Sequence, residues 1–341
     1  MSKQIKKVCL IGAGRAGMIH ARNFRHNVPG FTIAAVVDPV EEAAVAACKE
    51  LDIRQYYLDY TQALENPEID GVIVVSPTKF HCEIVVAAAK RGKHILCEKP
   101  MAMNGEECDK MIAAARENKV ILQVGFMRRY DAGFVAAKEA VDSGAIGRVV
   151  LVKSLTRGPS TPRPWMYDIK KSNGPLAEVN SHDIDTLHWF TGSEFQHVYA
   201  IAGNYRCQDA REEFPDFYDN VVLTGHFKNG MQGCIDGAQG VGYGYDARVE
   251  ILGTDGVIYL GSTDQNSMIC TNRNGNKIQP FVKSWTNLFM EAYLNEDRHF
   301  AQCILEGNTP RVTGEDGRNA VRVVEAGNRS IAEKRIVYLD E

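Results

Sequence analysis

The sequence predicts an α/β protein with two domains, the first of which is built on a doubly wound parallel sheet. Apolar, β-branched runs alternate with amphipathic helical segments through the first third of the chain, and this rhythm changes after Gly125. Such βαβ alternation produces a parallel sheet that helices cover on both faces. The 341 residues also exceed one comfortable hydrophobic core. We therefore expect one domain over residues 1–126 and a second over residues 127–341.

The composition is that of an ordinary soluble protein with 45% hydrophobic and 24% charged residues. The formal charge of -4 is mild and the basic residues are scattered, so the basic stripe that nucleic acid or anionic lipid requires is missing. No run approaches the roughly 18 apolar residues of a membrane span, and the N-terminus has no apolar signal core. We expect a cytoplasmic protein with a small-molecule partner and no nucleic-acid or membrane partner.

The first domain is expected to alternate strands and helices in a regular order. The strands are predicted at residues 8–11, 33–37, 72–75, 94–97 and 120–124, and the helices at residues 15–27, 41–51, 79–91 and 104–118. The strands are short, apolar and β-branched, as strands buried on both faces are. Nine cysteines are scattered singly along the chain, which fits reduced and mostly buried thiols.

The glycine pattern "GAGRAG" stands between the first strand and its helix, and Asp38 closes the second strand. Together they form a strong dinucleotide-binding fingerprint. Gly12 permits a tight turn, Gly14 lets the backbone approach the pyrophosphate, and Gly17 allows close packing of the helix on the sheet. Asp38 is expected to bind the adenosine ribose and to repel a 2'-phosphate, so NAD is favoured over NADP. The alternative is a glycine turn with a surface aspartate.

The richer run "GVGYG" at residues 240–244 opens no helix, and we assign it to a strand or loop.

Charged residues end the strand at 94–97 in the stretch "LCEKPMA". Ligands of a doubly wound sheet bind beyond the carboxyl ends of its strands, so Lys99 is expected to face the nicotinamide. The alternative is a solvated lysine at a strand exit. The predicted cofactor contacts are Gly12, Ala13, Gly14, Arg15, Ala16, Gly17, Asp38, Ser76, Pro77, Thr78, His81, Glu98 and Lys99.

Three motifs, "GAGRAGMIHA", "SPTKFH" and "CEKPMA", occur in an order that resembles the Gfo/Idh/MocA oxidoreductase family over essentially the whole chain. The segments "LQVGFMRRYDAGF", "YGYD" and "SWTNLFMEAY" look most like bacterial NAD-dependent myo-inositol 2-dehydrogenases. The resemblance implies a Rossmann domain, then an α/β domain with a large open, mainly antiparallel sheet, in a homotetramer. It also makes Lys99 the catalytic lysine, followed by a proline that is usually cis.

The second domain is expected to contain one helix over residues 172–192, with Pro175 in its first turn and Thr191-Gly192 at its end. Glu178 and His182 are four residues apart and so share one face. The family carries an acid, usually aspartate, and a histidine at this spacing. The alternative is a surface pair. The strands of the second sheet are predicted around residues 148–157, 195–204, 220–227, 230–239 and 247–260, with a hairpin turn at residues 228–230.

Alcohol oxidation needs a base that removes the hydroxyl proton while hydride leaves carbon for the nicotinamide. Histidine has an ordinary pKa of about 6.5 and lysine one of about 10.4. We therefore assign His182 as the general base, Lys99 as its proton-relaying partner, and Glu178 as the residue that orients both. Which of His182 and Lys99 first accepts the proton is left open.

Further substrate contacts are carried over from the resemblance. Arg128, Tyr243, Tyr245 and Trp285 match positions that line the polyol pocket in relatives, and Asn180 is a further candidate; each could instead be a core residue. The segment 158–173 contains three prolines and is predicted to be a loop over the active site or an ordinary linker.

Metal-binding residue types crowd the second-domain helix, namely His182, Asp183, Asp185 and His188. Only His182 and Asp185 share a face closely, and no cysteine ligands or HExxH spacing accompany them. We expect no metal, because lysine and histidine can handle the proton.

The main hypothesis is an NAD-dependent dehydrogenase that oxidises one secondary ring hydroxyl of a cyclic polyol, such as myo-inositol, to the ketone. Three alternatives stay open. The first is dehydrogenation of another sugar or a glycoside, for example at C3. The second is glycoside hydrolysis with retained NAD, which some relatives perform. The third is a non-catalytic NAD-binding regulator.

Overall fold

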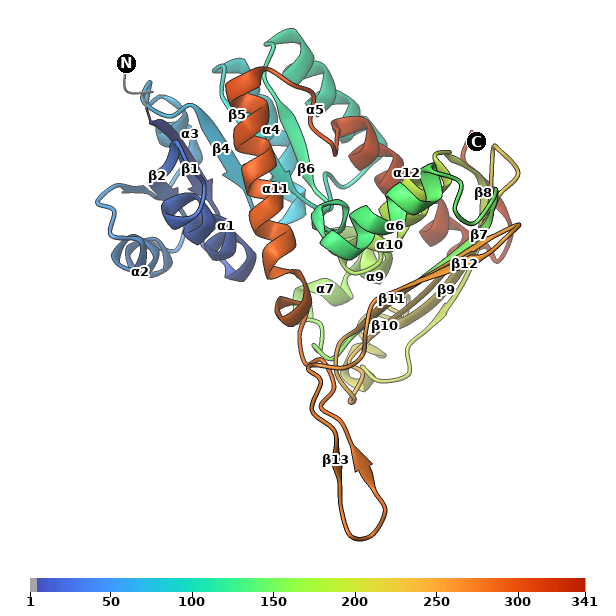
Figure 1. The fold of residues 1–341 in the computed structure, drawn as a ribbon. Coiled ribbons are helices and arrows are strands. Elements are labelled where there is room, and N and C mark those ends of the chain that lie inside the picture. The colour runs from blue at the N-terminus through green and yellow to red at the C-terminus, as the bar shows by residue number, and fades with distance from the viewer. Residues whose placement is uncertain (1–4, 341) are drawn as a thin grey trace. The chain divides into compact units, whose positions relative to one another are not determined.

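The computed structural model of the protein describes residues 5–340 and consists of two compact units (Figure 1). The N-terminal unit contains the chain through Tyr130 together with Met290–Val321, and the C-terminal unit contains Asp131–Phe289 and the chain from Arg322. The division expected after residue 126 thus lies four residues further on. In addition, a stretch near the C-terminus that the sequence analysis placed in the second domain packs with the first.

The N-terminal unit is a six-stranded parallel sheet with the strand order β3-β2-β1-β4-β5-β6. This is the doubly wound order of a dinucleotide-binding fold, as predicted. The strands are β1 (Lys6–Ile11), β2 (Phe31–Val37), β3 (Tyr56–Tyr57), β4 (Gly71–Val74), β5 (His94–Glu98) and β6 (Leu122–Gly125). Their burial is nearly continuous, which explains why they read as unbroken apolar runs.

The helices of this unit lie close to their predicted positions. They are α1 (Arg15–His26), α2 (Glu41–Leu51), α3 (Tyr60–Leu64), α4 (His81–Lys90) and α5 (Gly105–Glu117), with short 3₁₀ helices η1 (Thr78–Phe80) and η2 (Met127–Tyr130). Asn104 caps α5 by accepting a hydrogen bond from the Glu107 backbone N–H at 2.9 Å. β3 and α3 were not predicted, because they are too short for a periodic pattern; the side chain of Asp59 caps α3.

Two long helices near the C-terminus supply the returning stretch. These are α11 (Thr286–Glu306) and α12 (Gly314–Glu333). Phe300 and Ala301 of α11 belong to the same buried cluster as Leu10 of β1 and Phe24 of α1. The Phe24 and Phe300 rings meet edge to face with centroids 6.4 Å apart. The N-terminal unit is therefore complete only when this late segment joins its core.

The C-terminal unit is built on a seven-stranded mixed sheet with the order β12-β11-β7-β10-β9-β8-β15. Its strands are β7 (Val149–Gly158), β8 (Phe195–Gly203), β9 (Asn220–Phe227), β10 (Gln232–Gln239), β11 (Asp246–Gly253), β12 (Val257–Leu260) and β15 (Val337–Tyr338). The β7–β10 pair is parallel and the other pairs are antiparallel, so the expected open, mainly antiparallel sheet is confirmed. The strand predicted at 247–260 is instead two strands, because the chain turns at residues 254–256.

Two local predictions in this sheet are confirmed. The turn at residues 228–230 joins β9 to β10, and Gly230 has a positive φ of 87°. The "GVGYG" run lies in the connection between β10 and β11 and opens no helix.

The helix predicted over residues 172–192 is wrong in its middle. Its two ends are where expected, but the chain forms two helices, α9 (Gly174–Glu178) and α10 (Ser181–Thr191), with a break at Val179 and Asn180. The Asn180 side chain donates to Asp183 Oδ2 at 2.8 Å, and such side-chain bonds compete with regular helix. The break means that Glu178 and His182 are not on one continuous helical face.

The remaining helices of this unit are short apart from α6. They are α6 (Ala132–Asp142), α7 (Pro164–Tyr167), α8 (Ile169–Ser172) and the 3₁₀ helix η3 (Gln208–Ala210). The segment 158–173 is thus partly helical rather than the predicted loop, and Tyr167 of α7 packs on Phe217 with ring centroids 4.8 Å apart.

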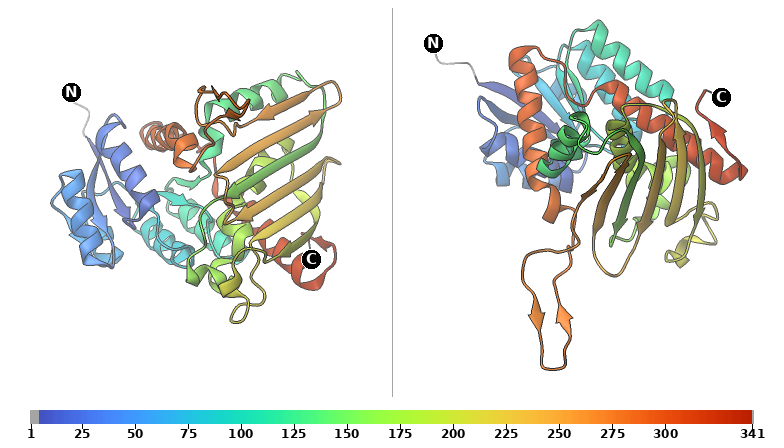
Figure 2. Two further views of the ribbon diagram at one scale, coloured as in Figure 1. Left: turned by 90° about the horizontal axis from the view of Figure 1, so that it is seen from below. Right: turned by 45° about the vertical axis from the view of Figure 1, so that its right-hand side comes forward.

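The two faces of the C-terminal sheet are unlike. On one face, Asp183 of α10 accepts hydrogen bonds from Ser154 and Thr156 of β7 at 2.5 and 2.9 Å, which fastens the helix to the sheet. The opposite face carries the alternate residues and is open in Figure 2. Its exposed large apolar side chains include Tyr199, Ile201, Leu252, Val257 and Tyr259. A small hairpin of β13 (Cys270–Thr271) and β14 (Lys277–Ile278) extends from the same unit (Figure 1).

Within residues 5–340, the structure contains no helix that is both long enough and apolar enough to cross a membrane.

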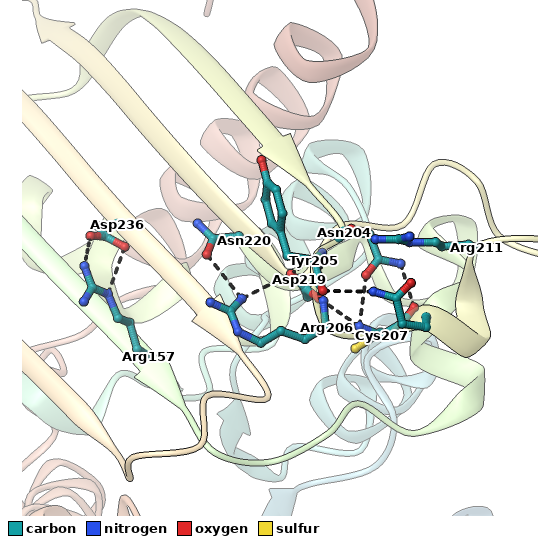
Figure 3. A network of polar contacts seen from close by, with 10 residues as sticks. Arg157, Asn204, Tyr205, Arg206, Cys207, Arg211, Asp219, Asn220 and Asp236 are labelled. Atoms are coloured by element: carbon teal, nitrogen blue, oxygen red, sulfur yellow. Dashed lines mark hydrogen bonds and ion pairs between the residues drawn. The ribbon is translucent and has the colours of Figure 1, made fainter.

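Asp219 anchors the loop between β8 and β9 (Figure 3). Its buried carboxylate accepts hydrogen bonds from the backbone N–H groups of Tyr205, Arg206 and Cys207 and from the Arg206 guanidinium. Buried donors that lose their acceptor keep the full cost of their desolvation. This one side chain therefore holds the fold of the loop.

We expect Asp219→Asn to lower the free energy of unfolding by about 1–3 kcal/mol, because an amide turns two donor hydrogens toward backbone N–H groups. The exposed Glu194–Lys228 pair is the matched control. Glu194→Gln should change the free energy of unfolding by at most about 1 kcal/mol. Urea unfolding followed by circular dichroism measures both. Equal losses in the two variants would contradict the role of Asp219.

Candidate active site

The glycine loop after β1 has the geometry that the fingerprint requires. Gly12 has a φ of +105°, and a Cβ there would lie 2.6 Å from the Val75 carbonyl oxygen. A Cβ on Gly17 would lie 2.0 Å from the Gly12 carbonyl oxygen, so helix α1 and the loop touch through bare backbone. A Cβ on Gly14 would meet no atom within 4 Å. The three glycines therefore serve three tasks, a turn, an open approach and close packing.

Asp38 does more than the sequence analysis assigned to it. One carboxylate oxygen accepts from the Ala13 backbone N–H at 2.9 Å, and the other accepts from the Val40 N–H at 2.9 Å. The carboxylate thus ties the end of β2 to the glycine loop. Each oxygen has a second lone pair, so the same side chain can still accept from a ribose hydroxyl.

The edge of the sheet fits a dinucleotide. Gly14 is the N-cap of α1, no side chain caps this end of the helix, and the first turn has no acidic residue. Such an uncapped N-terminus is a site for a pyrophosphate. The Ser76 hydroxyl after β4 is buried, and it has no hydrogen-bond partner among the described residues. Gly12–Gly17, Asp38 and Ser76 are the residues that would hold the cofactor.

Lys99 follows β5 at the same sheet edge as the glycine loop. Cys97 of β5 pairs with Val74 of β4, which in turn pairs with Ile11 of β1, so the three strands end together. The Lys99–Pro100 peptide bond is cis, as the resemblance implied. The Lys99 backbone N–H donates to Glu98 Oε2 at 2.9 Å, and the Lys99 side chain is partly exposed.

His81 is predicted to border the cofactor, and the structure places it between two loops of this edge. Its Nε2 lies 2.7 Å from the Ser76 carbonyl oxygen, and its Nδ1 lies 3.0 Å from that of Pro100 and 3.5 Å from Cys97 Sγ. Burial lowers the pKa of His81, which keeps the ring neutral. A neutral ring has one N–H for these two carbonyl oxygens, and we assign it to Nε2 because the contact with Ser76 is the shorter one, which leaves the Pro100 oxygen without a proton from His81.

Sequence reasoning missed His20, a fully buried residue of α1. Its Nδ1 lies 2.6 Å from Asp297 Oδ1 of α11, and its Nε2 lies 3.2 Å from Glu98 Oε1. Burial alone would lower the pKa of His20, but the charges and hydrogen bonds of Asp297 and Glu98 outweigh it and hold that pKa well above 6.5. A histidine on the buried face of a helix gives no periodic signal that separates it from core residues.

The other predicted acid and base lie in the C-terminal unit. His182 is in the first turn of α10 and 7% exposed, and Glu178 ends α9 with intermediate exposure. Asn180 is fully buried at the helix break, and its amide packs against Gly237 of β10. Asp183, considered above as a metal ligand, accepts hydrogen bonds from the side chains of Ser154, Thr156 and Asn180.

The predicted aromatic contacts are also in the C-terminal unit, whereas Arg128 is in the N-terminal unit. Tyr243 is exposed, and its hydroxyl lies 3.4 Å from Asp246 Oδ2. Tyr245 is buried beside it and donates its backbone N–H to Val282. Trp285 stands just before α11 with intermediate exposure, and Arg128 is 1% exposed in η2.

Two family models match nearly the whole chain. The first, an NAD-binding Rossmann fold of an oxidoreductase family, covers residues 6–126, and the second, the C-terminal α/β domain of the same family, covers residues 138–339. The chain belongs to the Gfo/Idh/MocA oxidoreductase family. Its N-terminal unit is the NAD-binding domain of this family, so NAD is the cofactor.

Relatives with named activities cover the same length as this Gfo/Idh/MocA protein. The myo-inositol 2-dehydrogenase of Thermotoga maritima is 33% identical over 98% of this chain and 99% of its own. The scyllo-inositol 2-dehydrogenase (NAD(+)) of Bacillus subtilis is 33% identical over 100% of this chain and 98% of its own. The crystal structure of scyllo-inositol dehydrogenase from Lactobacillus casei with bound NAD(H) and scyllo-inositol has a TM-score of 0.90 and 27% identity, over 99% of this chain and 100% of that one.

The contrasting glycines give a test of the NAD site. We expect Gly14→Ala to leave thermal unfolding unchanged, because its Cβ enters open space, but to raise the dissociation constant for NAD at least about tenfold by blocking the approach to the pyrophosphate. Gly17→Ala should instead lower stability by about 1–3 kcal/mol through the contact with Gly12. Calorimetric titration with NAD and differential scanning calorimetry measure the two effects. The reverse pattern would contradict the assigned tasks.

Proposed function

We propose that the protein is an NAD-dependent dehydrogenase that oxidises a secondary ring hydroxyl of a cyclic polyol of the inositol type to the ketone. The observation that carries the proposal is the position of Lys99 at the carboxyl end of β5, on the sheet edge that holds the glycine loop. The relatives named above act on myo-inositol and scyllo-inositol, and they support this choice of substrate class.

In the proposed reaction the carbinol C–H bond breaks and its hydride reduces the bound nicotinamide, while the O–H proton passes to the protein and the C–O bond becomes a carbonyl. The products are the ketone, NADH and one proton. We assign Lys99 and His182 to the removal of the proton and Glu178 to their orientation. Bound NAD supplies the hydride acceptor; the residues of this chain bind, orient and deprotonate the alcohol.

The proposed substrate contacts are Arg128, Asn180, Tyr243, Tyr245 and Trp285, with Lys99, Glu178 and His182. Guanidinium, amide and phenol groups donate to hydroxyls, and an aromatic face packs against the C–H face of a ring. Glu178 stands where the family usually has aspartate. Its extra methylene favours a different ring pose, which makes another sugar or a glycoside the competing substrate class.

A substrate panel tests the proposal. NADH formation is measured at 340 nm with myo-inositol, scyllo-inositol, glucose and simple glycosides, each with NAD and with NADP. We expect turnover of an inositol with a clear preference for NAD, because Asp38 repels a 2'-phosphate. Turnover of glucose or a glycoside alone would shift the substrate class. Aglycone release without net NADH would indicate a glycosidase, and NAD binding without any turnover would indicate a regulator.

Lys99→Ala should lower kcat by at least about a hundredfold, which is the usual contribution of a positioned proton-transfer group, while the dissociation constant for NAD changes less than about threefold. The exposed Lys90→Ala on α4 is the control and should retain wild-type kcat. Equal loss of turnover and NAD binding in Lys99→Ala would mean that this lysine is structural.

We further propose that the chain forms a homo-oligomer, with a homotetramer as the expected size, and that it works in the cytoplasm. The open face of the C-terminal sheet, defined above by Tyr199, Ile201, Leu252, Val257 and Tyr259, supports self-association. All nine cysteines are free thiols, which fits a reducing compartment.

Light scattering after gel filtration measures the mass, and Ile201→Lys should reduce it because the new charge would be buried in the contact. Leu305→Lys, an exposed apolar site in the N-terminal unit, is the control. A wild-type mass of one chain would contradict the oligomer.

A further inference from the structure

We propose that His20 is a positioning residue for the dehydrogenase reaction: as an imidazolium it holds the Glu98 carboxylate, which in turn fixes the main chain of Lys99. The inference rests on the proposed function, because it names the support of the lysine to which that function assigns proton transfer. His20 contacts no substrate in this proposal. It acts through Glu98, one residue before Lys99.

The hydrogen bonds of the His20 ring require both of its nitrogens to donate. Nδ1 lies 2.6 Å from Asp297 Oδ1, and Nε2 lies 3.2 Å from Glu98 Oε1. Ionised carboxylates only accept, and a neutral imidazole has a single N–H. Charge-assisted hydrogen bonds of this kind are stronger than neutral ones, and His20, Glu98 and Asp297 are all buried. The ring is thus a buried cation shared by two carboxylates from β5 and α11.

Further side chains lie close to His20 and its two carboxylate partners. Glu296 of α11 has a carboxylate oxygen within 4.8 Å of ligand atoms of His20 and Glu98, and the Tyr293 ring meets the imidazole edge to face at 5.3 Å. Asn23 of α1 donates to the second oxygen of Asp297 at 2.8 Å. Burial raises the pKa of Asp297, and His20 opposes this rise. Without the imidazolium, the buried carboxylates of Glu98, Asp297 and Glu296 would lose the positive charge of His20.

Glu98 passes this constraint to the sheet edge. Its Oε1 faces His20, while its Oε2 accepts from the Lys99 backbone N–H at 2.9 Å. Gly125 of β6 lies against it so closely that a Cβ would come within 3.1 Å of the Glu98 carboxyl carbon. The His20 and Lys99 N–H groups, together with the nearby Gly125 backbone, hold the carboxylate in its observed orientation. That orientation fixes the point from which the Lys99 side chain departs.

This arrangement explains two sequence features that the cofactor fingerprint leaves over, the histidine in "GAGRAGMIHA" and the glutamate before Lys99 in "CEKPMA". Since the same helix carries the glycine loop at its N-terminus and His20 in its second turn, α1 connects the cofactor site to the lysine loop. A shift of about 1 Å in a reacting group can cost about a hundredfold in rate.

Asp297→Asn is the central test. The new amide keeps an acceptor for Nδ1 but removes the charge that holds the proton on His20, so the pKa of the ring falls. As pH rises through this lowered pKa the ring becomes neutral. The amide can then donate to Nδ1 while Nε2 keeps the single N–H, so the bond to Glu98 Oε1 is no longer charge-assisted and holds the carboxylate less tightly. We expect the ratio of variant to wild-type kcat to fall steadily from about pH 6 to pH 9, by up to about tenfold, because a charge-assisted hydrogen bond is roughly twice as strong as a neutral one, with the KM for NAD within about twofold. A merely destabilised enzyme gives a ratio that does not depend on pH.

Further variants make the test specific. The double variant Asp297→Asn/Glu98→Gln is compared with the single variant Glu98→Gln. The ratio of their kcat values should not depend on pH, because residue 98 then has no carboxylate for His20 to hold. If Asp297→Asn does not fold, nitrogen NMR of the wild-type imidazoles gives a second test: both ring nitrogens of His20 should be protonated at pH 7, and a neutral ring there would overturn the inference. His94→Gln is the matched control: His94 accepts from the Ile121 N–H at 3.1 Å at the opposite end of β5, so its loss should leave the pH profile of kcat unchanged.

A readout independent of turnover separates this inference from the proposed function. Trace acetylation of Lys99, quantified by mass spectrometry against Lys90, should change with pH in Asp297→Asn beyond the wild-type profile, over the same pH window. If this change occurs while no polyol is oxidised, the positioning role stands and the proposed function fails. Flat kcat and acetylation ratios would overturn the inference. A divalent ion that survives dialysis against EDTA and is lost in His20→Gln would also overturn it, because a metal would then replace the imidazolium proton.

Discussion

The common direction of the strands in the N-terminal sheet is the constraint on which the candidate site depends. Because β1, β2, β4 and β5 all run the same way, their carboxyl ends meet at one edge. That edge receives the Gly12 turn, Asp38, Ser76 and the Glu98-Lys99 pair from four separate parts of the sequence. Hydrogen bonds between these loops, from Ala13 to Asp38 and from His81 to Ser76, then fix the edge locally.

Much of this edge could be predicted from the sequence, because each of its motifs is local. A glycine turn between a strand and a helix has a steric cause within a few residues, and the apolar runs of a buried parallel strand are equally local. The second unit was harder to predict. Its mainly antiparallel sheet was expected from the family resemblance, and its strands are visible in the sequence, but the break between α9 and α10 depends on the bond from Asn180 to Asp183. A helical spacing of four residues cannot reveal that bond.

The residues missed by sequence reasoning are those whose roles come from distant partners. His20 and Asp297 are separated by 277 positions in the chain. In the sequence alone, His20 cannot be told from the other buried residues of the amphipathic helix α1, and Asp297 cannot be told from the other polar residues of the long helix α11. Their charges become meaningful only when α11 packs beside α1. In the same way, the second task of Asp38 appears only once the glycine loop is folded against β2.

The return of Met290–Val321 to the N-terminal unit also sets an order of events during synthesis. Domains usually fold in turn as they leave the ribosome. Here the first unit must wait for almost the entire polypeptide, because Phe300 completes its core and Asp297 completes the buried charge pair with His20. A nascent chain that has left the ribosome only through Tyr130 therefore carries an incomplete nucleotide-binding unit. The two units mature together at the end of translation.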